Sequence, residues 1–471
     1  KFKHPVKELF FSAKEKTGIN NVIESTYTIS QLGQDIDGES SNDKSGYSVS
    51  VSSDGTRVAI GAISNAGSNS TAGHVRVYDW NSGTSLWTQV GQDIDGEAAG
   101  DNSGHSVSMS ADGTRVAIGA ISNDDRFVSN AGHVRVYEWD NVSWSQVGND
   151  IDGEAAYDYS GYSVSMSSDG TRVAIGAKQN DGNGSNSGHV RVYDWNSGTS
   201  LWTQMGSDID GEAAGDQSGY SVSMSPDGTR VAIGAPYNDS AAGSNSGHVR
   251  VYEWDNVSWS QVGNDIDGDA AGDYFGQSVS MSSDGTRVAI GAPYNDSAAG
   301  SNSGHVRVYD WNGTQWNKVG LDIDGDAAGD FFGHSVSMSS DGTRVAIGAP
   351  GDTWGAARAG HVRVYVESSG TWTQVGADTN GEADFDEFGY SVSMSSDGTR
   401  VAIGARGNDG TGSNAGHTRV YSLSGTSGSI EDRLLNISSS DQEFTTLLPG
   451  KRSDHRLIKN VKFACNGETI F

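Results

Sequence analysis

The chain has 471 residues, of which 65 are Gly and only 6 are Pro, and its formal net charge is −29. Its 12 Trp, 17 Tyr and 12 Phe recur at regular intervals, which excludes low-complexity disorder despite the high Gly content. No apolar run is long enough to span a bilayer, and the single Cys465 excludes an intramolecular disulfide.

Most of the negative charge lies in residues 25–430, whereas the two flanks are close to neutral. An acidic body of this kind repels nucleic acid and anionic membranes, and it favours cations or basic partners. We therefore expect no nucleic-acid binding and no membrane insertion.

One sequence element, S-V-S-[MV]-S-x-D-G-T-R-V-A-I-G-A, occurs seven times at spacings of 56 to 58 residues. Near-constant spacing indicates one structural unit repeated seven times rather than seven independent domains. The Asp-Gly pair of each copy begins at Asp54, Asp112, Asp169, Asp227, Asp284, Asp341 and Asp397.

Each unit predicts four short strands and no helix. In the second copy the strands are Ser106–Ser110, Thr114–Ala120, Gly132–Trp139 and Trp144–Ile151, and an Asp-Gly turn joins the first two. Four-stranded units of this length are typical of propeller blades, which must stack to bury their faces. The first strand is rich in Ser and therefore suits the crowded position nearest the axis.

The ends of the repeat array predict a closed ring. The array begins with a lone fourth-strand element at Thr26–Ile36 and ends with a third-strand element at Gly416–Tyr421. The first element can supply the strand that the last unit lacks, whereas an open stack would need polar caps instead. We predict an all-β, seven-bladed β-propeller of four-stranded blades over residues 25–425.

Two of the units carry a recognisable pair of motifs. Phe275-Gly276 leads to Gly291-Ala292-Pro293, and Phe332-Gly333 leads to Gly348-Ala349-Pro350. These pairs resemble the FG-GAP repeats of integrin α-subunit propellers, and the resemblance covers about 400 residues. It implies an integrin-like interaction module. The calcium loop of that family is missing from its usual place, which here is only S-S-D-G-T.

A second acidic motif precedes each first strand, in a segment that we call the linker. Carboxylates fall at positions 1, 3, 5 and 9 of D-I-D-G-E-A-A-G-D, where oxygen ligands at alternate positions suit Ca²⁺. The alternative is that these residues form turns and accept backbone N–H bonds. The candidate calcium ligands are Asp93, Asp95, Glu97, Asp101, Asp150, Asp152, Glu154, Asp158, Asp208, Asp210, Glu212, Asp216, Asp265, Asp267, Asp269, Asp273, Asp322, Asp324, Asp326 and Asp330. The spacing also occurs at Asp35, Asp37, Glu39 and Asp43, and at Asp378, Asn380, Glu382 and Asp386.

The loops after R-V-A-I-G-A vary between copies while the strands scarcely change. Variable loops on a rigid scaffold are where recognition usually resides, and we expect them to share a face with the linkers. Trp354 with Arg358, and Arg126 with Phe127, suit a contact with a protein partner or, alternatively, local loop packing.

A His recurs at the start of the third strand in every copy, at His74, His133, His189, His248, His305, His361 and His417. We interpret it as a structural hydrogen-bonding residue rather than a metal ligand or a catalytic base. No nucleophile elbow, phosphate loop or Cys/His cluster is present in the sequence. Seven equivalent acidic motifs also argue against a hydrolase, which needs one acid/base pair. We therefore predict that the protein is not an enzyme.

The flanks differ from the repeats. His4–Phe11 resembles a segment of the double jelly-roll major capsid proteins of large DNA viruses, and Ile458–Phe463 with Asn466-Gly467 resembles a later strand and turn of that family. The resemblance implies jelly-roll flanks at residues 1–24 and 426–471, with the propeller inserted between them. It also implies a jelly roll only partly contained in this chain, which would extend on both sides.

Two functional hypotheses follow. The first is a structural virion protein, trimeric through its jelly rolls, which displays the propeller on the capsid exterior towards other subunits, a host surface protein or a glycan. The second is a stand-alone, calcium-dependent extracellular adhesion propeller.

Overall fold

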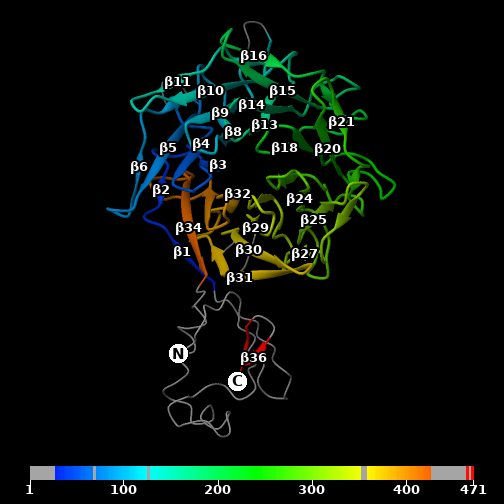
Figure 1. Cartoon of the computed structure of the whole chain (residues 1–471). Coiled ribbons are helices and arrows are strands. Elements are labelled where there is room, and N and C mark those ends of the chain that lie inside the picture. Colours follow the sequence, from blue (N-terminus) through cyan, green and yellow to red (C-terminus); the bar gives the residue numbers. More distant parts are fainter. Residues whose placement is uncertain are drawn as a thin grey trace. The chain divides into compact units, whose positions relative to one another are not determined.

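The computed structural model describes residues 27–66, 71–124, 128–351, 358–425, 463–465 and 468–470. The chain divides into two units, residues 29–424 and the two flanks 1–28 and 425–471 taken together. Residues 29–424 form a ring of seven blades around a central axis (Figure 1). The all-β, seven-bladed prediction is therefore confirmed.

Each blade is an antiparallel sheet, and in blades 1 to 6 the strand order follows the sequence order from the axis outwards. The fourth strand of most blades is broken into two short pieces, both of which pair with the third strand. Blade 1 comprises β3 (Ser45–Val51), β4 (Arg57–Ala62), β5 (His74–Asn81), β6 (Leu86–Gln89) and β7 (Ile94–Asp95). Blade 2 comprises β8 (Ser103–Met109), β9 (Arg115–Ala120), β10 (His133–Trp139), β11 (Trp144–Gln146) and β12 (Ile151–Asp152).

Blades 3 to 5 repeat this plan. Blade 3 comprises β13 (Ser160–Met166), β14 (Arg172–Ala177), β15 (His189–Asn196), β16 (Leu201–Gln204) and β17 (Ile209–Asp210). Blade 4 comprises β18 (Ser221–Met224), β19 (Arg230–Ala235), β20 (His248–Trp254), β21 (Trp259–Gln261) and β22 (Ile266–Asp267). Blade 5 comprises β23 (Ser278–Met281), β24 (Arg287–Ala292), β25 (His305–Trp311), β26 (Trp316–Lys318) and β27 (Ile323–Asp324).

Blades 6 and 7 vary the plan. Blade 6 has an unbroken fourth strand and comprises β28 (Ser335–Met338), β29 (Arg344–Ala349), β30 (His361–Ser368) and β31 (Thr371–Asn380). Blade 7 comprises β32 (Phe388–Met394), β33 (Arg400–Ala405), β34 (His417–Gly425) and, from the other end of the chain, β1 (Tyr27–Gln31) and β2 (Ile36–Asp37). In Figure 1 the first strands surround the centre and the outer strands β6, β11, β16 and β21 lie at the periphery.

The ring closes as the sequence predicts. Strand β1 pairs with β34, and the Leu32 N–H donates to the Val420 carbonyl at 2.7 Å. The interface between blades 7 and 1 repeats the bonds of the other interfaces. For example, the Ser391 hydroxyl donates to the Gly46 carbonyl at 2.9 Å, as the Ser48 hydroxyl does to the Gly104 carbonyl at 2.7 Å.

The hydrophobic core lies between neighbouring blades. One cluster joins Val75, Val77 and Ile94 of blade 1 to Val107 and Ile118 of blade 2. The second strands contribute Val and Ile side chains that are almost fully buried all round the ring. Because each blade buries its faces only against its neighbours, the ring needs all seven.

Glycine is required where blades meet. A Cβ atom at Gly61 would lie 2.1 Å from the carbonyl oxygen of Gly104 in the next blade. Gly104 itself has a φ of +87°, a conformation that favours Gly. The glycine at the start of the first strand and the glycine of the G-A element therefore form a close backbone contact between adjacent blades.

The flanks contain one short hairpin among the described residues, β35 (Phe463–Cys465) paired with β36 (Glu468–Ile470). The segments that carry the capsid-like resemblance otherwise lie outside the described residues. No helix in the part of the chain that the structure describes is long and apolar enough to cross a bilayer.

Candidate functional site

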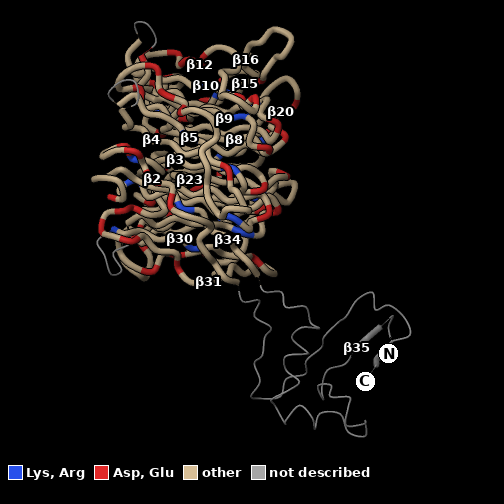
Figure 2. The backbone as a smooth tube through the Cα atoms, turned by 90° about the vertical axis from the view of Figure 1, so that its left-hand side faces the viewer, with Lys and Arg blue, Asp and Glu red and all other residues tan. Residues whose placement is uncertain are grey.

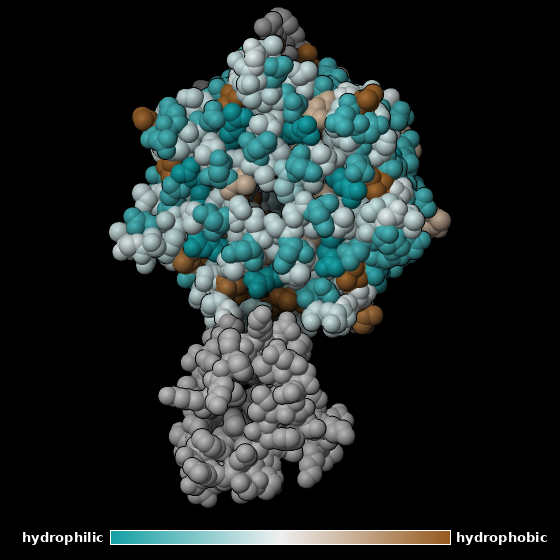
Figure 3. All heavy atoms as spheres, viewed as in Figure 1, coloured by the Kyte–Doolittle hydropathy of each residue, from teal (hydrophilic) through white to brown (hydrophobic). Residues whose placement is uncertain are grey.

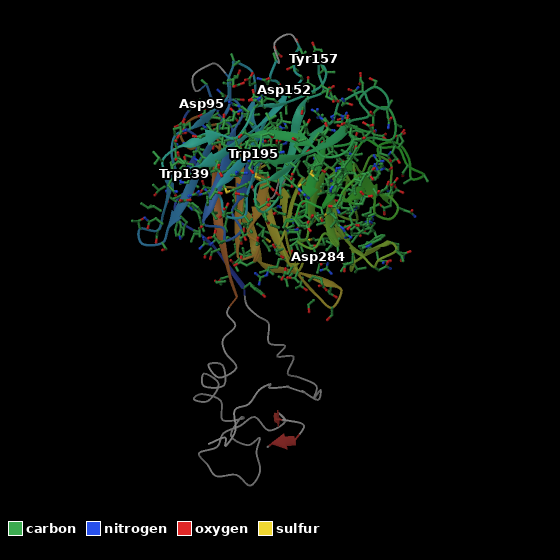
Figure 4. The ribbon with its side chains drawn as sticks, turned by 45° about the horizontal axis from the view of Figure 1, so that its top comes forward. Asp95, Trp139, Asp152, Tyr157, Trp195 and Asp284 are labelled. Atoms are coloured by element: carbon green, nitrogen blue, oxygen red, sulfur yellow. The ribbon has the colours of Figure 1, made fainter. Side chains whose placement is uncertain are left out.

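The linkers and the variable loops share one face of the ring, as predicted, and we call it the linker face. The Asn65 amide, in the loop after β4, donates to the Asp43 carboxylate of the preceding linker at 3.0 Å. Figure 4 shows Asp95 and Asp152 towards one side of the ring and Asp284, in an Asp-Gly turn, towards the other.

Acidic residues lie along both sides of the ring, with Lys and Arg among them (Figure 2). On the Asp-Gly side, the Arg of the second strand pairs with a carboxylate of the third strand, as in Arg57 with Asp79 at 2.6 Å. On the linker face, six linkers carry four motif carboxylates and the seventh carries three, against one Arg from each third strand. The linker face is therefore the more acidic side.

The structure spreads the four carboxylates of one linker over different partners. Position 9 is a buried turn residue, because the Asp101 carboxylate accepts the Ala98 N–H at 2.8 Å and the Asn123 amide at 3.3 Å. Position 1, Asp93, accepts the Gln89 amide at 2.6 Å. Position 3, Asp95, lies in β7, and the backbone carbonyl of this residue accepts a hydrogen bond from Arg135 at 2.8 Å.

Positions 1 and 5 meet across adjacent linkers instead. Position 5 of one linker, the third-strand His of the next blade and position 1 of the following linker bring their ligand atoms within 4.8 Å of one another. The ring closure extends this arrangement, because Asp35 completes the group of Glu382 and His417 in blade 7 and Glu39 begins that of blade 1.

In blades 5 to 7 the third-strand Arg bridges the two carboxylates. Arg307 donates to Asp269 at 2.5 Å and to Asp322 at 2.9 Å. Arg363 joins Asp326 and Asp378 in the same way, and Arg419 joins Glu382 and Asp35. The Arg hydrogen bonds lower the pKa of Asp269 and of Asp378, so both carboxylates are fully ionised near neutral pH.

In blades 1 to 4 the corresponding Arg points elsewhere. Arg76 donates to the backbone carbonyl of Asp37 at 2.7 Å and approaches Glu39 only to 3.6 Å. Arg135, Arg191 and Arg250 repeat this geometry, at 3.4 to 3.6 Å from the linker Glu. Burial raises the pKa of Glu97, Glu154 and Glu212, the opposite direction from the bridged carboxylates.

One residue separates the two groups of blades. The residue before the first-strand glycine is Ser45, Ser103, Ser160 or Ser218 in blades 1 to 4, which we call the serine blades. It is Phe275, Phe332 or Phe388 in blades 5 to 7, the phenylalanine blades, and each ring is fully buried. The Arg363 guanidinium lies 5.9 Å from the Phe332 ring, whereas that of Arg76 lies 5.6 Å from Tyr78.

Aromatic side chains also form an arc across the first strands, and Figure 3 shows a hollow at the centre of the ring. Tyr47, His105 and Tyr162 follow one another with ring centroids 4.7 to 5.1 Å apart. Lys178 places its amine 3.7 Å from the Tyr162 ring, and burial lowers the pKa of this Lys to about 8. Arg406 lies 3.6 Å from the Tyr390 ring.

Grooves also lie between blades at the outer side. One, of about 440 Å³, is lined by Trp139 and Trp195 of adjacent blades with Glu138, Asp140 and Gln146 (Figure 4). Aromatic faces beside polar groups suit a small polar ligand such as a sugar ring.

Of the predicted partner-binding residues, Arg358 is exposed, and its carbonyl accepts the Glu387 N–H at 3.1 Å. Arg126, Phe127 and Trp354 lie outside the described residues.

The interpretation of the repeated His as a hydrogen-bonding residue is wrong for His74 and His189. Both are about 1% exposed, but neither ring nitrogen of either residue makes a hydrogen bond. The backbone of the third strand places the imidazole towards the carboxylates at a distance too long for a bond, 3.8 Å in both cases.

Lys178 and Arg406 were missed as site residues. The sequence signal is that they are the basic residues at the position after R-V-A-I-G-A, where the other copies have Ile or Pro. The sequence also shows that the residue before the first-strand glycine is Ser in four blades and Phe in three. It does not show that this difference accompanies a different orientation of the third-strand Arg.

Comparison with known proteins agrees with the fold. The FG-GAP repeat family model matches residues 151–193, 208–252, 259–309 and 377–421, so these segments of the ring are similar to FG-GAP repeats. A propeller of FG-GAP repeats is an architecture of ligand-binding and adhesion modules. No curated protein matches the chain.

Among solved structures, the chain is similar to a Bacteroides uniformis protein named provisionally as a 6-phosphogluconolactonase, at 13% identity and a TM-score of 0.49. The match covers 72% of this chain and 86% of that chain. A likeness of this size carries no inference about activity.

Proposed function

We propose that the propeller is a non-catalytic interaction module, inserted in a second domain and displayed from it, which binds a partner through the linker face. The acidic motifs that could have served catalysis recur all round the ring, whereas a hydrolase needs one distinct acid/base pair.

The observation that carries the proposal is the position of the two ends of the ring. Strands β1 and β34 are neighbours in blade 7, and a Cβ atom at Gly425 would lie 3.0 Å from the ring of Tyr27. A domain whose ends lie together can be inserted in a loop of another domain without disturbing either.

The charge of the linker face supports a partner with a basic surface. Carboxylates of the serine blades, such as Glu39 and Glu97, are about half exposed and have only distant Arg partners. Interspersed variable loops on the same face supply the specific contacts, and long-range attraction speeds the encounter.

We propose further that the second domain is the jelly roll of a capsid protein, because the flanking segments resemble that family. The test is cryo-electron microscopy of purified particles, in which the proposal expects ring-shaped density of this size on the exterior, in one copy per capsid subunit. A protein found only in the medium or at a cell surface, and missing from particles, contradicts the capsid role.

The alternative is a calcium-dependent extracellular adhesion propeller. It expects that removing calcium from the whole protein lowers both its melting temperature and its adhesion, and that calcium alone restores both. The spread of the four carboxylates of one linker over different partners favours the first proposal.

A further inference from the structure

We propose that each serine blade holds a divalent transition-metal ion, best matched by Zn²⁺, between two linker carboxylates and the third-strand His. The sites are clearest in blade 1, at Glu39, His74 and Asp93, and in blade 3, at Glu154, His189 and Asp208. This proposal does not depend on the identity of the partner.

The geometry recurs with the repeat. In each serine blade the three residues offer one ligand atom apiece within 4.8 Å of one another. Blades 2 and 4 have the equivalent groups Glu97, His133 and Asp150, and Glu212, His248 and Asp265. The Glu39 side chain is 44% exposed, so it is free to move the short distance that metal–oxygen bonds of about 2 Å require.

The histidine gives the independent evidence for a ligand. His74 is buried, and neither of its ring nitrogens makes a hydrogen bond, although its Nδ1 lies 3.8 Å from the Asp93 carboxylate. His189 faces Asp208 in the same way. Leaving a buried nitrogen without a partner is costly, and a metal between the nitrogen and the carboxylate removes that cost.

The phenylalanine blades show how the same carboxylates are neutralised without a metal. There the guanidinium lies between the two carboxylates, as Arg363 does between Asp326 and Asp378. In blade 1, by contrast, Arg76 donates to a backbone carbonyl and, among the described residues, makes no ion pair with Asp93. The position between the carboxylates is left to another cation.

The ligand set selects the kind of ion. Calcium prefers six to eight oxygen ligands, whereas one imidazole nitrogen with two carboxylate oxygens is typical of zinc and its neighbours. Water completes the coordination on the exposed side.

The test is isothermal titration of the whole, chelator-treated protein with Zn²⁺. The proposal expects about four sites, one per serine blade. His74→Gln should lower the stoichiometry by one. The matched control, His361→Gln in blade 6, should leave it unchanged, because Arg363 already holds the carboxylates there.

Glu39→Gln provides a second variant, because its side chain is partly exposed and the substitution spares the fold. It should weaken one site at least tenfold, and Co²⁺ in place of Zn²⁺ should give visible absorption that both variants reduce. A wild-type protein that takes up no Zn²⁺ overturns the proposal. So does a stoichiometry that His74→Gln does not lower together with an affinity that Glu39→Gln does not weaken.

Discussion

The serine blades and the phenylalanine blades have nearly the same sequence, but they differ in how the third-strand Arg contacts two adjacent linker carboxylates. Both bring two linker carboxylates together beside a buried His. In blade 6 the Arg363 guanidinium bridges the carboxylates, while in blade 1 Arg76 donates to the Asp37 carbonyl and does not bridge them. Blades 5 and 6 have both Phe and an Asp at position 5 of the linker, so either residue could account for the Arg bridge. Blade 7 separates the two, because it has the bridge with Phe388 and a Glu at position 5.

The comparison teaches that a single buried residue can set the electrostatics of a surface. In the phenylalanine blades the aromatic ring lies against the His of the third strand, as Phe332 does against His361 at 6.2 Å between centroids. In the serine blades the ring is missing, and the Oγ of Ser45 is buried without a hydrogen-bond partner. We infer that the ring fills the space into which the Arg otherwise turns.

The largest effect is expected in blade 7, because the Arg419 bridge of this blade includes Asp35, which lies between β1 and β2 near the start of the chain. Deleting residues 27–37 removes β1 and β2 and should cost on the order of 5 kcal/mol or more of unfolding free energy, enough to abolish cooperative unfolding. Urea denaturation followed by Trp fluorescence measures this. A stable ring after the deletion would show that closure through β1 is not needed.

Phe332→Ser should convert a phenylalanine blade towards the serine type. The substitution leaves a cavity in a fully buried position, so we expect a loss of about 3 kcal/mol in denaturant unfolding. The matched control is Ser103→Ala, which removes a buried hydroxyl without a partner and should be neutral or slightly stabilising. Equal effects of the two substitutions would argue against different roles for Ser and Phe.

Replacing the third-strand Arg should lower the free energy of unfolding more in a phenylalanine blade than in a serine blade. Arg363→Met leaves two carboxylates without a counter-charge and should cost about 2 kcal/mol, a value reduced because both carboxylates are partly exposed. Arg76→Met loses a bond to a backbone carbonyl and a 3.6 Å contact with the partly exposed Glu39, and it should cost about 1 kcal/mol. Thermal unfolding of both variants decides, and a larger loss for Arg76→Met would reverse the assignment.

The smallest expected effect concerns two histidines of the first strands. It tests whether the difference between the serine blades and the phenylalanine blades is confined to the linker face. His105 in blade 2 and His334 in blade 6 both belong to the aromatic arc, and burial lowers the pKa of His105 to about 3 and of His334 to about 4. Because the unfolded chain binds these protons below about pH 6.5, stability is full above that pH and falls as the pH drops towards 4.

His105→Tyr and His334→Tyr, which copy Tyr162 of blade 3, should each make the melting temperature less dependent on pH between 6.5 and 4. Both variants should change it by similar amounts. A pH dependence altered in only one of them would extend the difference between the blades to the axis.

The repeat, the four-stranded blades and the closure through Thr26–Ile36 could be predicted because each depends on a local pattern or on sequence phase. The grouping of the carboxylates could not, because positions 1 and 5 of one linker serve different blades. Asp93, for example, meets Glu39 of the preceding linker rather than Glu97 of its own. Such a group forms only when two linkers and a third strand are placed side by side.

The most direct test of the account is a crystal structure of the Ser160→Phe variant. In the wild-type protein Arg191 donates to the Asp152 carbonyl at 2.7 Å. The account predicts that the new ring turns the Arg191 guanidinium to bridge Glu154 and Asp208, as Arg363 bridges its two carboxylates. An Arg191 that still donates to the Asp152 carbonyl, although the introduced aromatic ring is buried beside it, would contradict the account.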